Sequence, residues 1–494
     1  MKDKKQNKRI NGGHRLLFFC ILCLFGLYVA VSYAEEQPQR EQSKTKVILL
    51  HTDNLTYDQY RHPGAQILTG NVQFQHDGVL MYCDSACFYE ATNSFDAFGH
   101  VKMVQGDTLD LVGDMLLYNG LDQLARVRHN VVLTHRESKL YTDSLDYDRL
   151  YELGYFFEGG KLVDKDNVLT SDWGQYSPPT RQAVFNYNVK LENPKFTLIS
   201  DTLNYNTLTS MAEIVGPSNI DSGDNHIYSE SGFYNTQTEE AILLDRSIVT
   251  NKGRKMVGDS LYYDSKSGVG EGFRNVVYTD EVNKNMLTGN YCYYNDSTGY
   301  SMATDSAVAI DYSQRDTMYM HADTFKVYTF YMDTDSMYRE VRGYHKVRSY
   351  RMDVQSVCDS LVFDSRDTCI TMYRDPIVWN GGQQVLGEVI KVYLNDSTID
   401  RIHVIDQTLS VDRIDSVHYN QVAGKEMTSY FRDGEMYETW VNGNVYVDYY
   451  MFDDDSLMIG LNYTETTELK LFMKDRKMEK IWMPASTGVI YPIV

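Results

Sequence analysis

The phrase Asp201-Thr-Leu203-Asn-Tyr205-Asn206 decides the fold, because the same pattern returns along most of the chain. Close copies are Asp143-Ser-Leu145-Asp-Tyr147-Asp148 and Asp259-Ser-Leu261-Tyr-Tyr263-Asp264. Looser copies begin at Asp53, Asp84, Asp114, Asp172, Glu230, Asn290, Asp323, Asp359 and Glu388. The spacing is 29 residues four times in succession from Asp143 to Asp259, and it varies between 29 and 36 residues elsewhere. A fixed period of this length predicts a repeat architecture in which neighbouring units pack on one another.

Apolar and polar residues alternate within each unit, which is the pattern of a strand with one buried face. Leu203 and Tyr205 are two residues apart and therefore share a face. Some sixteen residues after the leading acid comes a second pattern, often Asn-Val-x-Leu, as at Asn130 and Asn188. Asn tolerates the conformations that reverse a strand. Each unit is therefore predicted to form two or three short strands joined by tight turns.

These units predict an all-β fold, a stacked repeat β-jelly roll of about 29-residue units. A parallel β-helix would also bury a continuous core, but the long period and the Asn-rich hairpin signals favour the jelly roll. We expect no transmembrane barrel, because the predicted strands are shorter than the roughly nine to eleven residues that a span requires. The twelve units occupy residues 45–400, and residues 401–494 are expected to form a terminal cap or a small β-domain.

The first 34 residues have the three parts of a secretory signal. A basic start that includes Lys2 and Arg9 precedes an apolar run from Leu16 to Val31, and Ser32-Tyr33-Ala34 comes before Glu35. We expect cleavage after Ala34 and an exported protein. An uncleaved membrane anchor is the alternative, because the run of 16 residues is only slightly shorter than a spanning helix.

The charge of the exported chain excludes nucleic acid as a natural partner. Residues 35–494 contain 41 Lys and Arg against 67 Asp and Glu, a net charge of -26. Nucleic acid is a polyanion that proteins bind mainly through Lys and Arg. We therefore expect no nucleic-acid binding.

The chain lacks the sequence patterns of common catalytic and metal sites. It has no Gly-x-Ser-x-Gly, no His-Glu-x-x-His and no phosphate-binding glycine loop. The leading acids could bind calcium, but the glycine-rich nonapeptides of calcium-binding rolls are absent, and a turn function is favoured. Cys83 and Cys87 have no second ligand pair, and His129 and His135 have no third ligand. We expect no enzyme activity, no cofactor and no metal.

The repeat resembles the OstA-like family, also called LptA-like or organic-solvent-tolerance proteins. The resemblance rests on the Asp-x-Leu-x-Tyr-Asp phrases, on Gln421-Val-x-Gly424-x-x-Met427-x-x-Tyr430-Phe431 and on Pro484-x-x-x-Gly488-x-x-Tyr491-Pro492, and it covers about residues 45–494. It implies a periplasmic β-jelly roll that carries lipopolysaccharide towards the outer membrane, with acyl chains in an apolar interior groove. It also implies contact with other lipopolysaccharide-transport proteins, or with copies of itself, through edge strands.

The resemblance and the strand parity together give candidate groove residues, listed here: Leu145, Tyr147, Leu203, Tyr205, Leu261 and Tyr263. The expected ligand is lipopolysaccharide or a similar envelope glycolipid. The expected compartment is the periplasm, with association to the inner or outer membrane left open. A surface or envelope adhesin built on the same repeat and an inner-membrane-anchored relative of the transport system are the alternatives.

Overall fold

The computed structural model describes residues 45–493, except 314, 333, 353, 396–397, 454–456 and 475–476. The expected signal segment, residues 1–34, lies outside the described residues. Apart from one 3-10 turn, η1 (Glu90–Thr92), the regular structure described is antiparallel β. The prediction of an all-β, stacked β-jelly roll is confirmed. The described part of the chain contains no helix long and apolar enough to cross a membrane.

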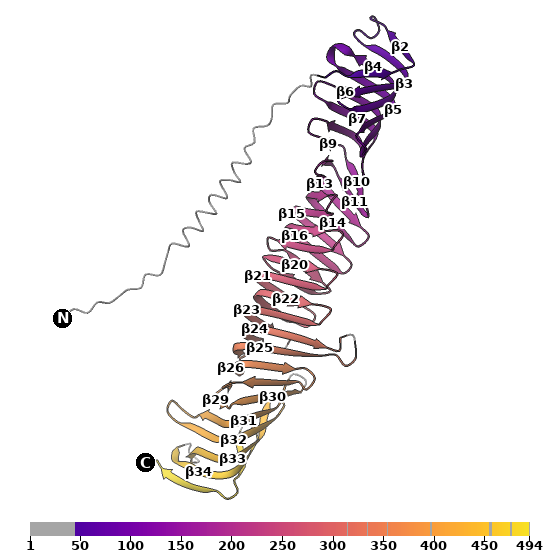
Figure 1. Ribbon diagram of the computed structural model, residues 1–494. Helices are drawn as coiled ribbons and strands as arrows, with labels where there is room; N and C mark the ends of the chain where they lie inside the picture. The colour runs from indigo at the N-terminus through magenta and orange to yellow at the C-terminus, as the bar shows by residue number, and fades with distance from the viewer. Residues whose placement is uncertain are drawn as a thin grey trace, which may run out of the picture. The chain divides into compact units, whose positions relative to one another are not determined.

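The chain divides into two compact units. Among the described residues, unit 1 comprises those up to Val131 together with Asp146–Leu153, and unit 2 comprises Val132–Leu145 together with those from Gly154 onwards. In unit 2 the strands follow one another in chain order, from magenta to yellow in Figure 1.

The strands of unit 1 are β1 (Ile48–His51), β2 (Asn54–Tyr57), β3 (Gln66–His76), β4 (Val79–Tyr89), β5 (Ser94–Gln105) and β6 (Leu109–Asn119). Two strands contribute residues to both units: β7 (Leu124–His135) and β8 (Ser138–Asp148). The first strands of unit 2 are β9 (Leu153–Phe156), β10 (Gly160–Asp164), β11 (Asn167–Ser171), β12 (Trp173–Ser177), β13 (Gln182–Asn193), β14 (Phe196–Asn206), β15 (Met211–Ser222), β16 (Asn225–Asn235) and β17 (Glu240–Leu244).

The middle strands are β18 (Ile248–Asn251), β19 (Arg254–Val257), β20 (Ser260–Asp264), β21 (Val269–Asp280), β22 (Asn285–Asn295), β23 (Tyr300–Asp311), β24 (Met318–Phe330), β25 (Tyr338–Tyr350), β26 (Val354–Asp364), β27 (Cys369–Tyr373), β28 (Ile377–Asn380), β29 (Gln383–Leu386) and β30 (Val389–Asn395). The last strands are β31 (Thr398–Arg413), β32 (Tyr419–Arg432), β33 (Glu435–Phe452), β34 (Met458–Lys474), β35 (Lys477–Trp482) and β36 (Thr487–Pro492).

A corner bends the long strands near their middle. The pairing of β13 with β14 shifts between Asn186 and Val189, and the two residues between them, Tyr187 and Asn188, have φ values of 65° and 53°. Two consecutive positive φ values turn the chain sharply, and Asn and Gly adopt them most readily. The same paired conformation recurs at Gly70–Asn71, Gly99–His100, His129–Asn130, Asp245–Arg246, Arg274–Asn275, Asp305–Ser306, His345–Lys346, Arg374–Asp375, Asp406–Gln407 and Gly443–Asn444.

The leading acid of the repeat lies at the same corner, on the neighbouring strand. The carboxylate of Asp172 accepts a hydrogen bond of 2.6 Å from Asn188 Nδ2, and its backbone N–H donates to the Tyr187 carbonyl. Equivalent Asp–Asn pairs are Asp53–Asn71, Asp114–Asn130 and Asp259–Asn275. The expected turn function is thus carried out through a partner 16 or 18 residues later, not through the backbone of the acid's own turn.

Each corner divides its strand between two sheets that face each other. We call the sheet with the Leu-x-Tyr segments wall A and the sheet with the Asn-Val-x-Leu segments wall B. Phe185 and Leu203 pair in wall A, while Leu191 and Leu198 pair in wall B, and all four side chains are buried between the walls. The hairpin ends opposite the corners form the mouth of the roll. The apolar core therefore lies between walls joined along one side only.

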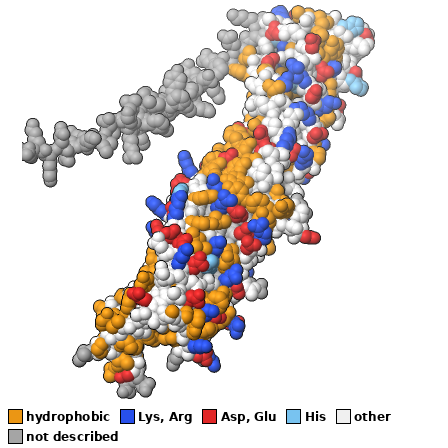
Figure 2. Space-filling view, turned by 60° about the horizontal axis from the view of Figure 1, so that its bottom comes forward, with side chains coloured by type: hydrophobic (Ala, Val, Ile, Leu, Met, Phe, Trp, Pro, Cys, Tyr) orange, Lys and Arg blue, Asp and Glu red, His pale blue; other side chains and the backbone are white. Residues whose placement is uncertain are grey.

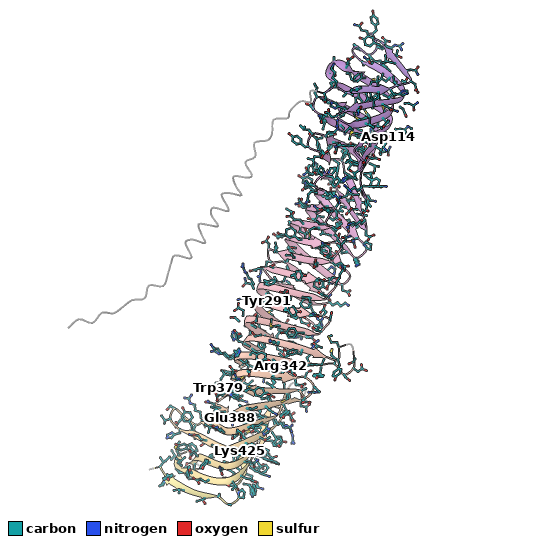
Figure 3. All side chains as sticks on the ribbon, viewed as in Figure 1. Asp114, Tyr291, Arg342, Trp379, Glu388 and Lys425 are labelled. Atoms are coloured by element: carbon teal, nitrogen blue, oxygen red, sulfur yellow. The ribbon has the colours of Figure 1, made fainter. Side chains whose placement is uncertain are left out.

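The meander continues beyond residue 400, which falls inside β31. β30 to β34 pair in chain order, and two further corners occur. The strand register skips Lys425 and Thr467 at these corners, in the place that the leading acid takes elsewhere; Glu388 and Lys425 are labelled in Figure 3. The separation of residues 401–494 as a cap or domain remains a prediction.

Truncating an inner leucine should destabilise the protein strongly. Leu145, Leu203 and Leu261 are at most 3% exposed, so replacement of any of them by alanine should cost about 2–5 kcal/mol. Ile199→Ala on the outer face of β14, where the side chain is 50% exposed, is the matched control and should cost less. Chemical denaturation measures the difference. Losses below about 0.5 kcal/mol at all three leucines would contradict the assigned inner face.

Candidate functional site

The six predicted groove residues all lie on the inner face, but they do not line one open cavity. Leu145, Tyr147, Leu203 and Tyr205 are at most 1% exposed and are surrounded by other core side chains. Leu261 is also buried, whereas Tyr263 is half-buried. Side chains therefore fill the inner face from Leu145 to Tyr205, and the inner face first becomes accessible to solvent at Tyr263.

In unit 1, a polar contact joins the walls at the mouth. The hydroxyl of Tyr118 in wall A lies 2.7 Å from His76 Nδ1 in wall B and accepts a 2.5 Å hydrogen bond from Arg149 Nη1. The Tyr118 hydroxyl therefore shares hydrogen bonds with both His76 and Arg149. His76 Nε2 is held 2.9 Å from the Thr45 hydroxyl.

Unit 2 repeats this arrangement twice. The hydroxyl of Tyr176 lies 2.8 Å from Nδ1 of His135. One repeat later, the Tyr205 hydroxyl donates to the carboxylate of Asp164 at 2.8 Å. The sequence separations of the three pairs are 42, 41 and 41 residues, so the same repeat positions meet each time.

Asp164 and its neighbours form a buried polar network. Ser138 donates to the second carboxylate oxygen of Asp164 at 2.8 Å. Asn167 donates to the hydroxyls of Tyr205 and Thr236 at 2.9 Å each. Asp164 and Asn167 are 2% and 3% exposed, respectively, so these hydrogen bonds satisfy polar groups that water does not reach.

A second layer of contacts connects the hairpin ends just outside the tyrosines. In unit 1, Gln123 donates to Asp77, and Gln105 donates to Glu152. In unit 2, the Lys165 ammonium donates to the Ser210 hydroxyl, and Lys195 forms an ion pair with Glu239. Two layers of polar contacts therefore close the mouth up to Glu239.

The closure changes at Tyr234. The ring of Tyr234 packs edge-on against Phe196 with centroids 4.6 Å apart, and its hydroxyl has no hydrogen-bond partner among the described residues. The equivalent wall B residue, Asn193, already donates to Asn167 and accepts from the Lys195 backbone. Tyr263 and Tyr294 stack on each other, and their hydroxyls likewise have no partner in the part of the chain that the structure describes.

From β18 to β30, the inner face is apolar and partly open; we call this region the open section. Its floor beside the corners is fully buried and includes Val276, Ala307 and Ala322. Nearer the mouth, the inner side chains are half-buried; they include Met256, Tyr263, Tyr278, Leu287, Tyr294, Ala309, Met320, Val341, Phe363 and Ile370. Figure 2 shows hydrophobic side chains gathered in patches on the face in view, between charged ones.

Small inner residues widen the space between the walls of the open section. At the inner positions of β21 to β23, Gly272 and Ala303 stand where β13 carries Phe185, Ala309 stands where β13 carries Leu191, and Cys292 stands where β14 carries Leu203. Some of this space is filled, since the ring of Tyr294 lies over Gly270. The open section thus combines a narrow apolar floor with half-exposed aromatic and aliphatic walls.

The site has no recognisable catalytic or metal-binding constellation. Within the described residues, no group of three or more His, Cys, Asp or Glu side chains could hold a metal ion. Cys292 and Cys358 lie buried on the inner face, and burial raises the pKa of Cys292 to about 11 and that of Cys358 to about 12. Both thiols are therefore protonated and weakly nucleophilic near neutral pH.

The residues that close the mouth were not predicted from the sequence. A signal was present, because a polar residue follows the wall B pattern at a fixed distance: His76, His135 and Asn193 come four residues after Val72, Val131 and Val189. The residue type varies, and the tyrosine partners of His76 and His135 belong to units further along the chain.

The mouth histidines make stability depend on pH. Burial lowers the pKa of His135 below its ordinary value of 6.5, and Arg136 and Arg181 lower it further; burial also lowers the pKa of His76. The unfolded chain therefore binds protons that the folded chain does not, so this stability is fully present above pH 6.5 and is lost progressively as the pH falls below 6.5 and through the lower pKa of the folded state.

Thermal unfolding at about pH 7.5 and about pH 5.5 tests this dependence. The acid-induced loss in melting temperature should shrink in a His76→Gln, His135→Gln variant, because glutamine can accept the tyrosine hydrogen bond without a charge. His321→Gln, at an exposed outer position, is the control. An unchanged acid-induced loss in the double variant would contradict the assignment.

Comparison with known proteins connects this architecture to a family. Residues 44–201 and 196–259 match the family model described as OstA-like protein. No curated protein matches the chain. The family is a transport and binding family of the bacterial envelope, not a family of enzymes. Residues 44–259 of the chain therefore match the OstA-like family, which is a family of lipopolysaccharide or lipid transport-type proteins.

Proposed function

We propose that the protein binds the acyl chains of lipopolysaccharide or a similar envelope glycolipid on the inner face of the open section. It carries this lipid through the periplasm towards the outer membrane without changing it chemically. The observation that carries the proposal is the half-exposed apolar inner face from β18 to β30, in a chain whose residues 44–259 match a lipid-transport family.

The physical basis is the exclusion of acyl chains from water. Burial of each methylene group is worth about 0.8 kcal/mol, so a chain held between Tyr294 and Met320 would be strongly favoured over the same chain in water. Both side chains are half-buried and inward-facing. The net charge of -26 does not oppose this contact, because an acyl chain carries no charge.

The proposed site lies further along the chain than most of the residues first expected to bind lipid. Leu145, Tyr147, Leu203 and Tyr205 form packed core in the closed part of the roll, and only Leu261 and Tyr263 lie in the open section. Burial alone leaves no surface for a ligand at the first four positions. We assign lipid contact in the resting protein to Tyr263 and the half-buried residues after it.

Edge strands at the two ends of the strand order could join the protein to its transport partners. In β36, every residue is exposed, including Val489 and Tyr491, and β2 at the beginning of the described chain is equally exposed. Exposed strands offer unpaired backbone groups to another strand. We propose other lipopolysaccharide-transport proteins, or copies of this chain, as the occupants of these edges.

Photo-crosslinking at adjacent residues of opposite parity tests the lipid site. A photoreactive residue at Leu287 or Met320 faces inward, whereas Thr288 and His321 face outward on the same strands, β22 and β24. Illumination with purified lipopolysaccharide should give adducts at the inward positions, because only these contact the acyl chains.

Equal labelling at inward and outward positions would indicate nonspecific contact and contradict the proposed site. No adduct at any position would instead favour a structural or adhesive role. The outer aromatic row of Tyr293, Tyr300 and Tyr328, whose adjacent rings lie 5.9 and 5.2 Å apart, would then be the surface to test.

A further inference from the structure

We propose that the polar contacts at the mouth of unit 2 form a latch, whose opening extends the lipid path from the open section into the closed strands. The latch comprises Tyr205, Asp164 and Asn167 with the outer pair Lys195 and Glu239. This inference rests on the proposed function and adds to it a device that controls how much of the inner face a lipid can occupy.

The inner face is continuous across the boundary between the closed and open parts. β17 pairs with β20, which places Leu243 opposite Leu261 and Ala241 opposite Tyr263 on wall A. Leu243 and Leu261 are both buried, and Tyr263 is the first inner tyrosine that stacks within the open section. No strand therefore crosses the path of a lipid chain that lies along Tyr263. Its further passage is limited by the contacts that hold walls A and B together.

The contacts that hold the walls together there are polar and replaceable. The Asp164 carboxylate is 2% exposed, has hydroxyl donors from Ser138 and Tyr205, and has no Lys, Arg or His within ion-pair distance among the described residues. Water can substitute for hydroxyl donors once the mouth opens, which a packed apolar contact would not allow. The hydroxyl donors thus satisfy the Asp164 carboxylate when the mouth is closed, and water can replace them when the mouth is open.

The outer layer of the latch is accessible to solvent. The Lys195 side chain is 65% exposed and the Glu239 side chain is 16% exposed, so the ion pair can exchange with water without disturbing the core. The pairing with Lys195 lowers the pKa of Glu239, with a further hydrogen bond from Ser265, which keeps this carboxylate charged and the pair intact near neutral pH.

The joined side of the roll would stay fixed while the mouth opens. The corner residues Tyr187 and Asn188 are fixed by the Asp172 pair, and the buried residues next to them keep the two walls in contact. Opening at the hairpin ends would therefore separate Tyr205 from Asp164 while leaving the corner closed. The geometry resembles a hinge with its axis along the corners.

A variant that combines Tyr205→Phe and Lys195→Ala, called the two-layer variant, tests the latch. Tyr205→Phe removes one hydroxyl and keeps the ring, and Lys195→Ala removes the outer cation. Tyr228→Phe is the matched control, because the Tyr228 hydroxyl is bonded to Glu230 on the outer surface. Thermal melting confirms that each variant folds, and Lys195→Ala alone provides a variant that leaves the core untouched.

Two readouts separate the latch from lipid binding. Spin labels at Leu208 and Asp166, on hairpin ends of walls A and B, report the distance across the mouth without any lipid, in a background in which the five cysteines after residue 34 are replaced by alanine. A photoreactive residue at Leu203 or Met320 reports contact with purified lipopolysaccharide in the closed and open parts, respectively.

The latch predicts a shift to longer distances in the two-layer variant and a gain of adduct at Leu203, with Met320 labelled in every protein. Unchanged distances, or longer distances without adduct at Leu203, would overturn the latch and leave the proposed function standing. An absence of adduct at Met320 in the unmodified protein would overturn the proposed function and the lipid path that the latch controls.

Discussion

The left-handed pair that bends each long strand, such as Tyr187–Asn188, is the constraint on which the rest of the structure depends. Two consecutive positive φ values are unfavourable for most residues, and at four corners a carboxylate on the neighbouring strand stabilises them by accepting a hydrogen bond from the Asn side chain. Each such corner turns one strand into two walls. Within each of the two compact units, the corners follow one another in strand register, so the walls form two facing sheets with one joined side and one mouth.

A roll joined on one side must either close its mouth or leave its interior accessible, and this chain does both. Up to Glu239, buried hydroxyl, imidazole and carboxylate groups join the walls, and Phe and Leu fill the space behind them. Beyond that point, Gly and Ala replace larger inner residues, and tyrosines such as Tyr263 and Tyr294 stack along one wall instead of bonding across. The same repeat thus yields a packed, stable section and an apolar surface suited to a lipid chain, without a change of fold.

The sequence predicts the parts of this structure that recur at a fixed spacing. The alternation of Leu203 and Tyr205 correctly predicts an all-β fold and one inward face, because strand parity depends only on local spacing. The extent of the accessible interior was not predicted, since it depends on whether Tyr205 finds an acceptor 41 residues earlier in the other wall. The corners at Lys425 and Thr467 were missed for a related reason: the strand register skips them like the others, but no acid marks them. A repeat that is recognised by its leading acid can no longer be followed where another residue type occupies the same backbone position.

Water accessibility along the inner face tests the central claim, that the mouth is closed up to Glu239 and open after it. Spin labels placed singly at Leu162, Leu198, Tyr263, Leu287 and Met320 can be measured by electron paramagnetic resonance power saturation with a water-soluble relaxation agent. The account predicts low accessibility at Leu162 and Leu198, which are at most 1% exposed, and a clear rise from Tyr263 onwards. Uniform accessibility along the series, whether low or high, would contradict it.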